Sequence, residues 1–418
     1  MGYTLTEKIL MRNTGKSSLQ AGELLTVKAD KVMVHDLFAP FVIEKFREMG
    51  FQKVWAPDKI VFVYDHLVPT SFSEDSRHHK IADGFATEQG IKAVHRSDGV
   101  CHQLMPELKY VIPGQVAFGT DSHTTTYGAV GALATGIGYT EMAAIFGTGE
   151  LWIKVPPTLK FNINGNLPEG VFAKDLILRI IGDIGADGAT YKAMEFGGTT
   201  IEGFSIASRM TLSNMAVEAG AKFGVIEPDE KTYEFSGIDG GDYQNLRSDP
   251  DAGYEKVYTY DATVLRPLVA CPSNVDNIKG AEEMRGTRID QGFIGSCTNG
   301  RLEDLEIAAR ILKGRKIAPY TKLIVTPASR SIYAEAVRKG IISILVEAGA
   351  IVNPPACGLC CGRSGGIVAD GERVIAANNR NFLGRMGGPK SEIFLASPAT
   401  VTASALEGKI VDPRNYFS

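Results

Sequence analysis

The sequence lacks the features of membrane, secreted and nucleic-acid-binding proteins. No apolar run approaches the roughly 20 residues that a helix needs to cross a bilayer. Residues 1–18 have neither the apolar core nor the small-residue cleavage site of a signal peptide, so we expect a cytoplasmic protein. The formal net charge of −4 offers no basic surplus for binding nucleic acid or anionic membranes by charge alone.

Cysteine and histidine are scarce, and they lie towards opposite ends of the chain. Six cysteines in 418 residues are too few for a secreted disulfide scaffold, which leaves metal binding, catalysis or simple burial as their roles. Five of the six follow residue 270, whereas all seven histidines fall within the first 123 residues. Side chains able to bind metals or move protons are therefore divided between the two ends.

The rest of the composition is that of a globular protein with more than one core. Hydrophobic residues make up 44% and charged residues 22% of a chain that is too long for one ordinary core. Strands are expected at residues 59–64, 116–119, 158–163, 291–295, 322–326 and 392–396. Helices are expected at residues 31–50, 79–89, 140–150, 173–184, 205–219, 302–313 and 329–339. This alternation predicts an α/β architecture with mostly parallel sheets.

Three α/β domains are expected, at residues 1–156, 157–270 and 271–418. Pro156 and Pro157 mark the first boundary, because consecutive prolines interrupt helices and strands. Residues 236–255 are polar and rich in glycine and aspartate, which predicts a surface loop ahead of the third domain.

Polar side chains follow three of the expected strands. Asp65 and His66 come after one strand, residues 121–123 (DSH) after another, and Cys297 after a third. Ligands of parallel α/β sheets bind beyond the carboxyl ends of the strands. Three strands that deliver polar chemistry to that edge indicate a site more strongly than any single residue does.

The late cysteines suggest a metal centre. Cys357 and Cys360 form a C-x-x-C pair on a glycine-rich loop, and Cys297 can join them only through the fold. Three thiolates on loops suit an iron–sulfur cluster with one open iron, four ligands would suit structural zinc, and buried inert cysteines or a redox pair are the simplest alternative. Cys361 is not expected to point at the same metal. Cys101 and Cys271 are most simply packed thiols.

The early Asp–His pairs and a late arginine loop suggest acid–base chemistry on an anionic substrate. A neighbouring carboxylate raises the pKa of a histidine and fixes its tautomer, although an adjacent Asp–His pair can equally be a capped loop. His102 is a similar candidate, whereas His78, His79 and His95 are expected at the surface. Arg380 and Arg385 could clamp a carboxylate, or could simply form salt bridges on a solvated loop.

Four motifs together resemble a known family. They are residues 121–123 (DSH), 295–299 (GSCTN), 357–360 (CGLC) and 379–385 (NRNFLGR), and they occur in the family's order. The chain resembles the aconitase superfamily, most closely the large subunits of its 3-isopropylmalate dehydratase and homoaconitase branch, over essentially its whole length.

The resemblance implies three aconitase-like α/β domains around a 4Fe-4S cluster, one per subunit, with one iron open to substrate. Cys297, Cys357 and Cys360 match the cluster ligands. The other matched positions fall into acid–base residues, supporting residues and substrate-binding residues. The catalytic matches are Asp65, His66, His102, Asp121, Ser122, His123 and, more weakly, Glu195. The substrate-binding matches are His35, Arg380 and Arg385.

The implied activity is a hydro-lyase acting on a 2-hydroxy dicarboxylate, with 3-isopropylmalate of leucine biosynthesis as the leading substrate. The family's catalytic base is a serine on a fourth, swivelling domain that this chain lacks, which implies a separate small subunit. Leu359 and Cys361 depart from the family's usual residues, so 2,3-dimethylmalate and homocitrate or homoaconitate stay open as substrates. An RNA-binding regulator in the cluster-free form and a zinc-stabilised interaction module are the alternatives of other classes.

Overall fold

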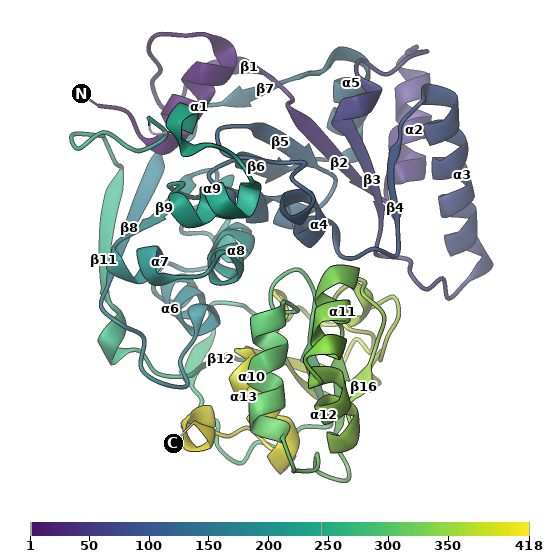
Figure 1. The fold of residues 1–418 in the computed structure, drawn as a ribbon, viewed down its shortest axis with the longest axis vertical. Coiled ribbons are helices and arrows are strands. Elements are labelled where there is room, and N and C mark those ends of the chain that lie inside the picture. The colour runs from purple at the N-terminus through teal and green to yellow at the C-terminus, as the bar shows by residue number, and fades with distance from the viewer. Residues whose placement is uncertain (1, 244, 418) are drawn as a thin grey trace.

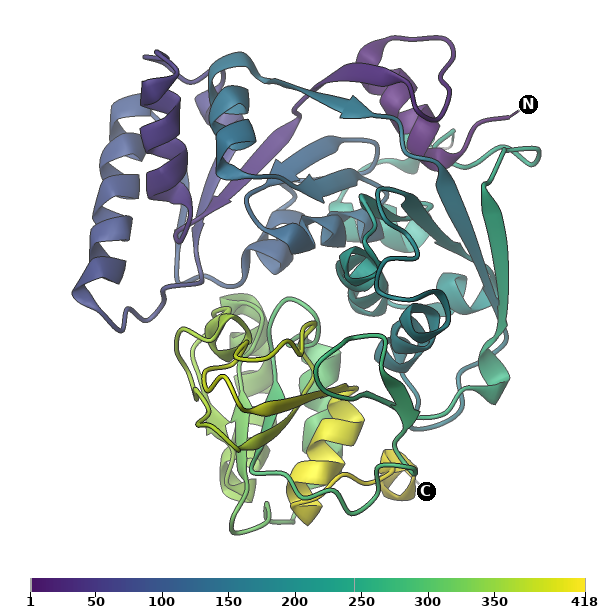
Figure 2. The same ribbon diagram turned by 180° about the vertical axis from the view of Figure 1, so that it is seen from behind.

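Three mainly parallel sheets organise the computed structural model, which describes residues 2–243 and 245–417 apart from the side chain of Asp242. The sheets have the strand orders β4-β3-β2-β5-β6, β10-β9-β8-β11 and β13-β12-β18-β17-β14-β15-β16. Figures 1 and 2 show the third sheet and its helices, drawn in green to yellow, on one side of the other two. The expected α/β architecture is confirmed, and the described residues form no fourth domain.

The first sheet is parallel throughout and carries the early candidate residues. Its strands are β2 (Lys31–His35), β3 (Ile60–Tyr64), β4 (Ala93–Arg96), β5 (Val116–Gly119) and β6 (Leu133–Gly136). Its helices are α2 (Ala39–Glu48), α3 (Ser73–Gln89), α4 (Cys101–Glu107) and α5 (Tyr139–Thr148), with a 3-10 segment, η2, at Ser122–Val130. All five residues of β3 are buried, as expected of a central parallel strand that is covered on both faces.

The single helix expected at residues 31–50 is wrong for its first part. The structure forms strand β2 at Lys31–His35 and begins helix α2 only at Ala39. Val32, Met33 and Val34 are all buried inside the sheet, and such a short apolar run fits a buried strand as well as a helix. Pro40 stands in the first turn of α2, where its missing N–H costs nothing.

The second sheet is also parallel and lies beside the first. Its strands are β8 (Thr158–Asn164), β9 (Ala193–Gly197), β10 (Phe223–Ile226) and β11 (Lys256–Asp261). Its helices are α6 (Ala173–Ile184), α7 (Thr199–Gly203), α8 (Ile206–Met215) and α9 (Glu230–Ser236), with the 3-10 segments η3 (Ala216–Ala219) and η4 (Gly240–Tyr243). Strand β8 follows Pro157 directly, although the exact domain boundaries stay a prediction.

The third sheet mixes a parallel core with an antiparallel edge. The parallel strands are β14 (Gln291–Ile294), β15 (Lys322–Val325), β16 (Ile351–Val352), β17 (Arg373–Ala376) and β18 (Glu392–Ala396). The antiparallel strands are β12 (Leu268–Ala270) and β13 (Ile278–Gly280). The helices are α10 (Leu302–Leu312), α11 (Arg330–Arg338), α12 (Ile341–Ala348) and α13 (Pro398–Glu407).

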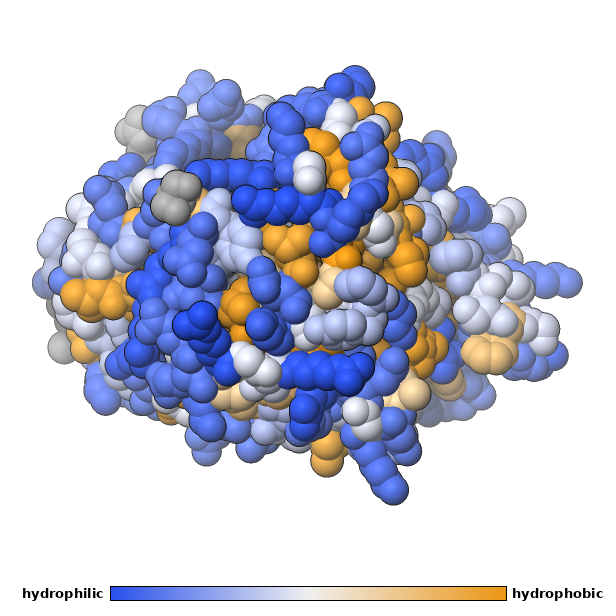
Figure 3. Space-filling view, turned by 90° about the horizontal axis from the view of Figure 1, so that it is seen from below, coloured by the Kyte–Doolittle hydropathy of each residue, from blue (hydrophilic) through white to orange (hydrophobic). Residues whose placement is uncertain are grey.

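A short antiparallel pair and helix α1 (Leu5–Thr14) complete the fold. The pair joins β1 (Leu24–Lys28) to β7 (Glu150–Lys154). The face in Figure 3 is largely hydrophilic, with apolar side chains gathered near its middle. Among the described residues, no helix is both long and apolar enough to span a membrane.

Candidate active site

The chemistry that follows β3 and β5 converges in one buried network. His66 Nε2 lies 3.5 Å from Asp121 Oδ2, and His102 Nε2 lies 2.8 Å from Asp121 Oδ1. The third sheet reaches the same place, because the Cys357 backbone N–H donates to the Asp65 carbonyl oxygen at 2.7 Å. The expectation that these strand ends meet is therefore fulfilled across two sheets.

Asp65 holds His66 in one orientation. The distance from Asp65 Oδ1 to His66 Nδ1 is 2.7 Å, and Asp65 Oδ2 accepts a hydrogen bond from the Cys101 backbone N–H, also at 2.7 Å. Burial alone would lower the pKa of His66, but the charges of Asp65 and Asp121 overcome it and hold the pKa well above its ordinary value. The raised pKa favours the protonated ring, and Nε2 is turned towards Asp121.

Asp121 is the hub of the network. Its Oδ1 accepts hydrogen bonds from His102 Nε2 and from the His123 backbone N–H, both at 2.8 Å. Burial would raise the pKa of this carboxyl, but hydrogen bonds from the three histidines hold it well below its ordinary value. Asp121 therefore stays ionised and fixes several imidazoles at once.

A carboxylate that the sequence analysis missed, Glu218, connects His123 to the arginine loop. Glu218 Oε1 lies 2.6 Å from His123 Nε2 and accepts from Arg380 Nε at 2.8 Å. Arg380 also donates to Ser122 Oγ at 2.8 Å. Glu218 lies on η3, inside the expected helix 205–219, and its only sequence signal is that it is the single acidic residue of that segment.

His35 packs on His66 rather than joining the hydrogen-bond network around Asp121. The two imidazole rings stack with their centroids 4.1 Å apart, and His35 Nε2 lies 3.3 Å from the Thr120 carbonyl oxygen. Burial and the neighbouring His66 lower the pKa of His35 to about 4, so its ring is neutral at pH 7. Its Nδ1 has no hydrogen-bond partner among the described residues.

Asp36, also missed from the sequence, fixes the turn that carries His66. Its two carboxylate oxygens accept from the backbone N–H groups of His66 and Leu67 at 3.1 and 3.0 Å. His79, expected at the surface, lies with Nε2 3.0 Å from Asp36 Oδ2 and stacks on Tyr64 at 4.6 Å. His79 therefore helps to support this turn.

The three candidate cluster cysteines are buried and lie on two loops of the third sheet. Cys297 follows β14 after Ser296, whose φ of 66° makes a sharp turn. The guanidinium of Arg301 donates to the Cys297 carbonyl oxygen at 2.6 Å and so fixes this turn. Cys357 precedes the 3-10 turn η6 (Gly358–Cys361), which contains Cys360.

Amide side chains surround these sulfurs with hydrogen-bond donors. Asn214 Nδ2 lies 3.2 Å and Asn379 Nδ2 3.5 Å from Cys297 Sγ, and Asn378 Nδ2 lies 3.6 Å from Cys360 Sγ. Donors directed at sulfur stabilise thiolates, which are the form that binds iron. These donors fit thiolate ligands at Cys297 and Cys360. Asn378 and Asn379 belong to the polar arginine loop that the sequence already marks as an ordered site, whereas Asn214 has no such signal in the sequence.

Cys361 lies next to Cys357, with which its thiol shares a hydrogen bond. Cys361 Sγ lies 3.3 Å from the Gly358 carbonyl oxygen and 3.8 Å from that of His66. Cys101 and Cys271 are buried among apolar side chains of the first and third sheets, as expected of packed thiols.

Comparisons with known proteins identify the family of the chain. The model of the aconitase family (aconitate hydratase) matches residues 7–280 and 275–408. The chain belongs to the aconitase family. It is 49% identical to 3-isopropylmalate dehydratase large subunit 1 of Methanopyrus kandleri, with 100% of each chain covered. It is 50% identical to the probable 3-isopropylmalate dehydratase large subunit of Methanothermobacter thermautotrophicus, with 99% of each chain covered.

A solved structure supports the aconitase-like fold. The holo-form of Thermococcus kodakaraensis aconitase X aligns with a TM-score of 0.52 at 13% identity, covering 91% of this chain and 94% of that one. The expected family, fold class and hydro-lyase class of enzyme are thus confirmed.

Glu195 is the one catalytic candidate that the structure keeps apart from the others. On strand β9, its carboxylate binds Lys160 Nζ at 2.7 Å, Ser248 Oγ at 2.8 Å and the Tyr254 hydroxyl at 3.0 Å. Ser248 and Tyr254 belong to segment 236–255, so part of this expected surface loop packs inward. A catalytic role for Glu195 stays a prediction that none of its contacts supports.

Proposed function

We propose that this chain is the large subunit of a 4Fe-4S hydro-lyase that removes water from, and returns it to, a 2-hydroxy dicarboxylate. The observation that carries the proposal is the meeting, at one buried place, of three thiols, two of which face amide donors, with an Asp–His pair and an arginine. We propose 3-isopropylmalate as the substrate, because relatives of 46–50% identity over nearly the full chain are named for it.

Cys297, Cys357 and Cys360 would hold the cluster, leaving the fourth iron without a protein ligand. A bound cluster supplies a Lewis acid that weakens the carbon–oxygen bond of the substrate hydroxyl. The residues of the chain provide the proton chemistry and the orientation of the substrate.

His66 is the proposed general acid. Its raised pKa favours a proton on the ring, and Asp65 fixes Nδ1, so Nε2 is the nitrogen that delivers the proton to the departing hydroxide. In the reverse direction the same nitrogen takes a proton from the attacking water. Asp121 holds negative charge beside the ring, and His102 keeps the Asp121 carboxylate in position.

The arginine loop is the proposed receptor for the substrate carboxylates. Arg380 is partly neutralised by Glu218, and Ser122 accepts its second hydrogen bond. Arg385 Nε has no hydrogen-bond partner among the described residues, which leaves a donor for a carboxylate. The Arg385 guanidinium also hydrogen-bonds with the Cys360 thiol, so this arginine stands beside the cysteine loops.

A separate small subunit is proposed to supply the catalytic base. Removal of the proton next to a carboxylate needs a base on the other face of the substrate, and the family places a serine there on its swivelling domain. The described residues include no such domain, and the relatives are named as large subunits. The departure at Leu359 does not favour another substrate, because its side chain is buried in the core.

An anaerobic reconstitution with iron and sulfide, followed by assay with the cognate small subunit, tests this function. We expect iron and sulfide near four per chain and the fastest turnover with 3-isopropylmalate in a panel that includes 2,3-dimethylmalate and homocitrate. Bound zinc without sulfide, or full activity of the large chain alone, would overturn the proposal.

A further inference from the structure

A cavity of about 330 Å³ opens on the second sheet, apart from the candidate active site. It lies beyond the carboxyl ends of the parallel strands β9 and β10, the edge at which α/β sheets bind ligands. None of the residues that line it belongs to the network around His66 or to the cysteine loops. Its volume stands at the lower end of the roughly 300–1,000 Å³ of ligand pockets, which indicates a small ligand.

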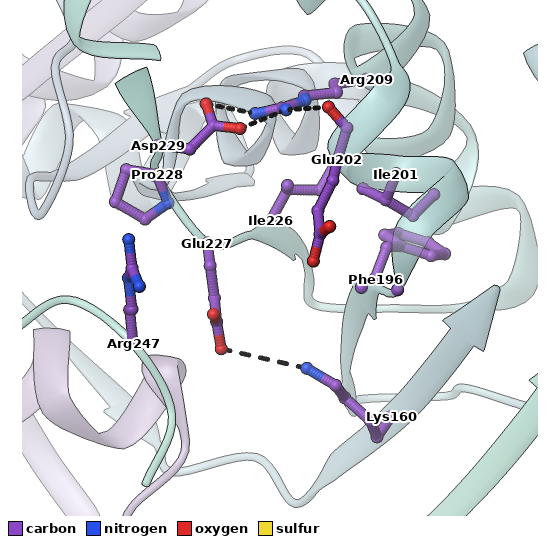
Figure 4. A pocket seen from close by; sticks show the side chains of 12 residues that line it. Lys160, Phe196, Ile201, Glu202, Arg209, Ile226, Glu227, Pro228, Asp229 and Arg247 are labelled. Carbon is purple, nitrogen blue, oxygen red and sulfur yellow. Dashed lines mark hydrogen bonds and ion pairs between the residues drawn. The ribbon is translucent and has the colours of Figure 1, made fainter. Parts of the chain in front are cut away.

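The walls of this cavity combine an apolar surface with charges of both signs. Phe196 and Ile226 are buried in the sheet and form the apolar side. Figure 4 shows Glu202 and Glu227 reaching towards one space, with Lys160 at its far side. Arg247 lines the cavity beside Glu227.

Two of these charges, Glu202 and Arg247, lie on exposed side chains and have no partner among the described side chains. No hydrogen bond or ion pair joins the Glu202 carboxylate or the Arg247 guanidinium to another described side chain. By contrast, Lys160 is engaged by Glu195 at 2.7 Å and stands 3.9 Å from Glu227. The cavity therefore offers one unpaired anion and one unpaired cation that do not neutralise each other.

A buried arginine, held by an ion pair, forms one wall of the cavity. Arg209 is 1% exposed, and its NH1 donates to Asp229 Oδ1 at 2.8 Å. The Nε of this guanidinium is buried without a hydrogen-bond partner among the described residues. A wall fixed in this way holds its shape before a ligand arrives, which lowers the entropic cost of binding.

We propose that this cavity binds a small zwitterion, an α-amino acid with an apolar side chain. Arg247 receives the carboxylate through two parallel N–H donors, and Glu202 with Glu227 receives the ammonium group. The apolar side chain of the ligand packs against Phe196 and Ile226. A plain dicarboxylate is disfavoured because two glutamates would repel its second charge.

Isothermal titration of the purified, cluster-loaded chain with L-leucine and L-methionine tests the site. Each blocked analogue, leucinamide without a carboxylate and N-acetyl-leucine without an ammonium group, is expected to bind at least about tenfold more weakly, the loss of one charged hydrogen bond. Arg247→Gln and Glu202→Gln are expected to weaken L-leucine binding by about the same factor. Arg288→Gln, an exposed arginine of the third sheet, is the matched control and should change nothing.

The result that overturns the proposal is equally direct. No heat from either amino acid at millimolar concentrations, or equal binding of leucine and its blocked analogues, would show that the cavity is not a zwitterion site. Binding that survives both Arg247→Gln and Glu202→Gln would place the ligand elsewhere. Hydrogen exchange of residues 196–203 with and without L-leucine gives a second readout, with slower exchange expected.

Discussion

The proton-handling residues and the cysteine loops meet at one site but are built in opposite ways. Around Asp65 and Asp121, each carboxylate accepts hydrogen bonds from histidines or backbone N–H groups, so the charges are already balanced. Around Cys297 and Cys360, amide donors dominate, and Arg385 keeps a buried donor without a partner. The first region is complete by itself, whereas the second is arranged to receive anionic sulfur and carboxylate.

The largest effect should come from breaking the second region alone. Cys360→Ser removes a proposed thiolate ligand, so cluster content and activity should fall by more than about 100-fold. Substitution of a residue that only hydrogen-bonds to a metal ligand costs up to about 100-fold, and loss of the ligand itself should cost more. Iron and sulfide analysis with an activity assay measures both. Cys271→Ser is the matched control, because Cys271 packs among apolar side chains of the third sheet and is not a proposed ligand. A retained cluster in Cys360→Ser would contradict the ligand assignment.

Breaking the first region alone should lower the rate and leave the cluster in place. His66→Gln keeps the approximate volume but cannot donate an acidic proton, so kcat should fall about 10²–10⁴-fold. Iron content and the visible absorption of the cluster should stay at the unmodified level. His78→Gln on helix α3 serves as the control. Equal losses of iron and of activity in His66→Gln would mean that the two regions are not separate.

The sequence contained the chemistry of the site but only part of its connections. The Asp–His pairs and Cys297 stand just after apolar strands, a local pattern that places each of them at the carboxyl edge of its sheet. Glu218 and Asn214 could not be found in this way, because each acts on a residue more than eighty positions away. Such partners depend on how two sheets pack, and no local pattern encodes that packing.

The fold shows the same limit. Helix α6 begins and ends as its apolar spacing predicts, because one face packs on the sheet. The helix predicted at residues 31–50 is wrong over strand β2, because the apolar run Val32–Val34 fits a helix as well as a strand. Only burial on two faces, which depends on the neighbouring strands, distinguishes the strand from a helix.

The free energy of unfolding should depend on pH through His35. This prediction tests the difference between the neutral ring of His35 and the ring of His66 stacked on it. Its folded pKa is about 4, against an ordinary value of 6.5, so the unfolded chain binds this proton first as the pH falls. The contribution of His35 to the free energy of unfolding is present above pH 6.5 and is lost as the pH falls from 6.5 to 4. The free energy of unfolding should therefore fall by about 2 kcal/mol from pH 7 to pH 5. Anaerobic urea unfolding at both pH values measures it.

The variant His35→Gln isolates that contribution. It removes the titrating ring, so its free energy of unfolding should fall by about 2 kcal/mol less than that of the unmodified chain over the same pH interval. An identical fall in both proteins would mean that His35 is already protonated at pH 7 or that its pKa is the same in the folded and unfolded states.

The smallest effect on activity is expected from substitution of Glu195, which lies in the second sheet and contacts neither the proton-handling residues nor the cysteine loops. Its carboxylate is taken up by Lys160, Ser248 and Tyr254, so Glu195→Gln should leave kcat within about twofold while lowering the free energy of unfolding by about 1–3 kcal/mol. Steady-state kinetics and urea unfolding of the same preparation measure the effect on kcat and the effect on the free energy of unfolding separately. If Glu195→Gln instead lost as much activity as His66→Gln at unchanged stability, Glu195 would be a catalytic residue. Strand β9 would then have to approach the cysteine loops when substrate binds.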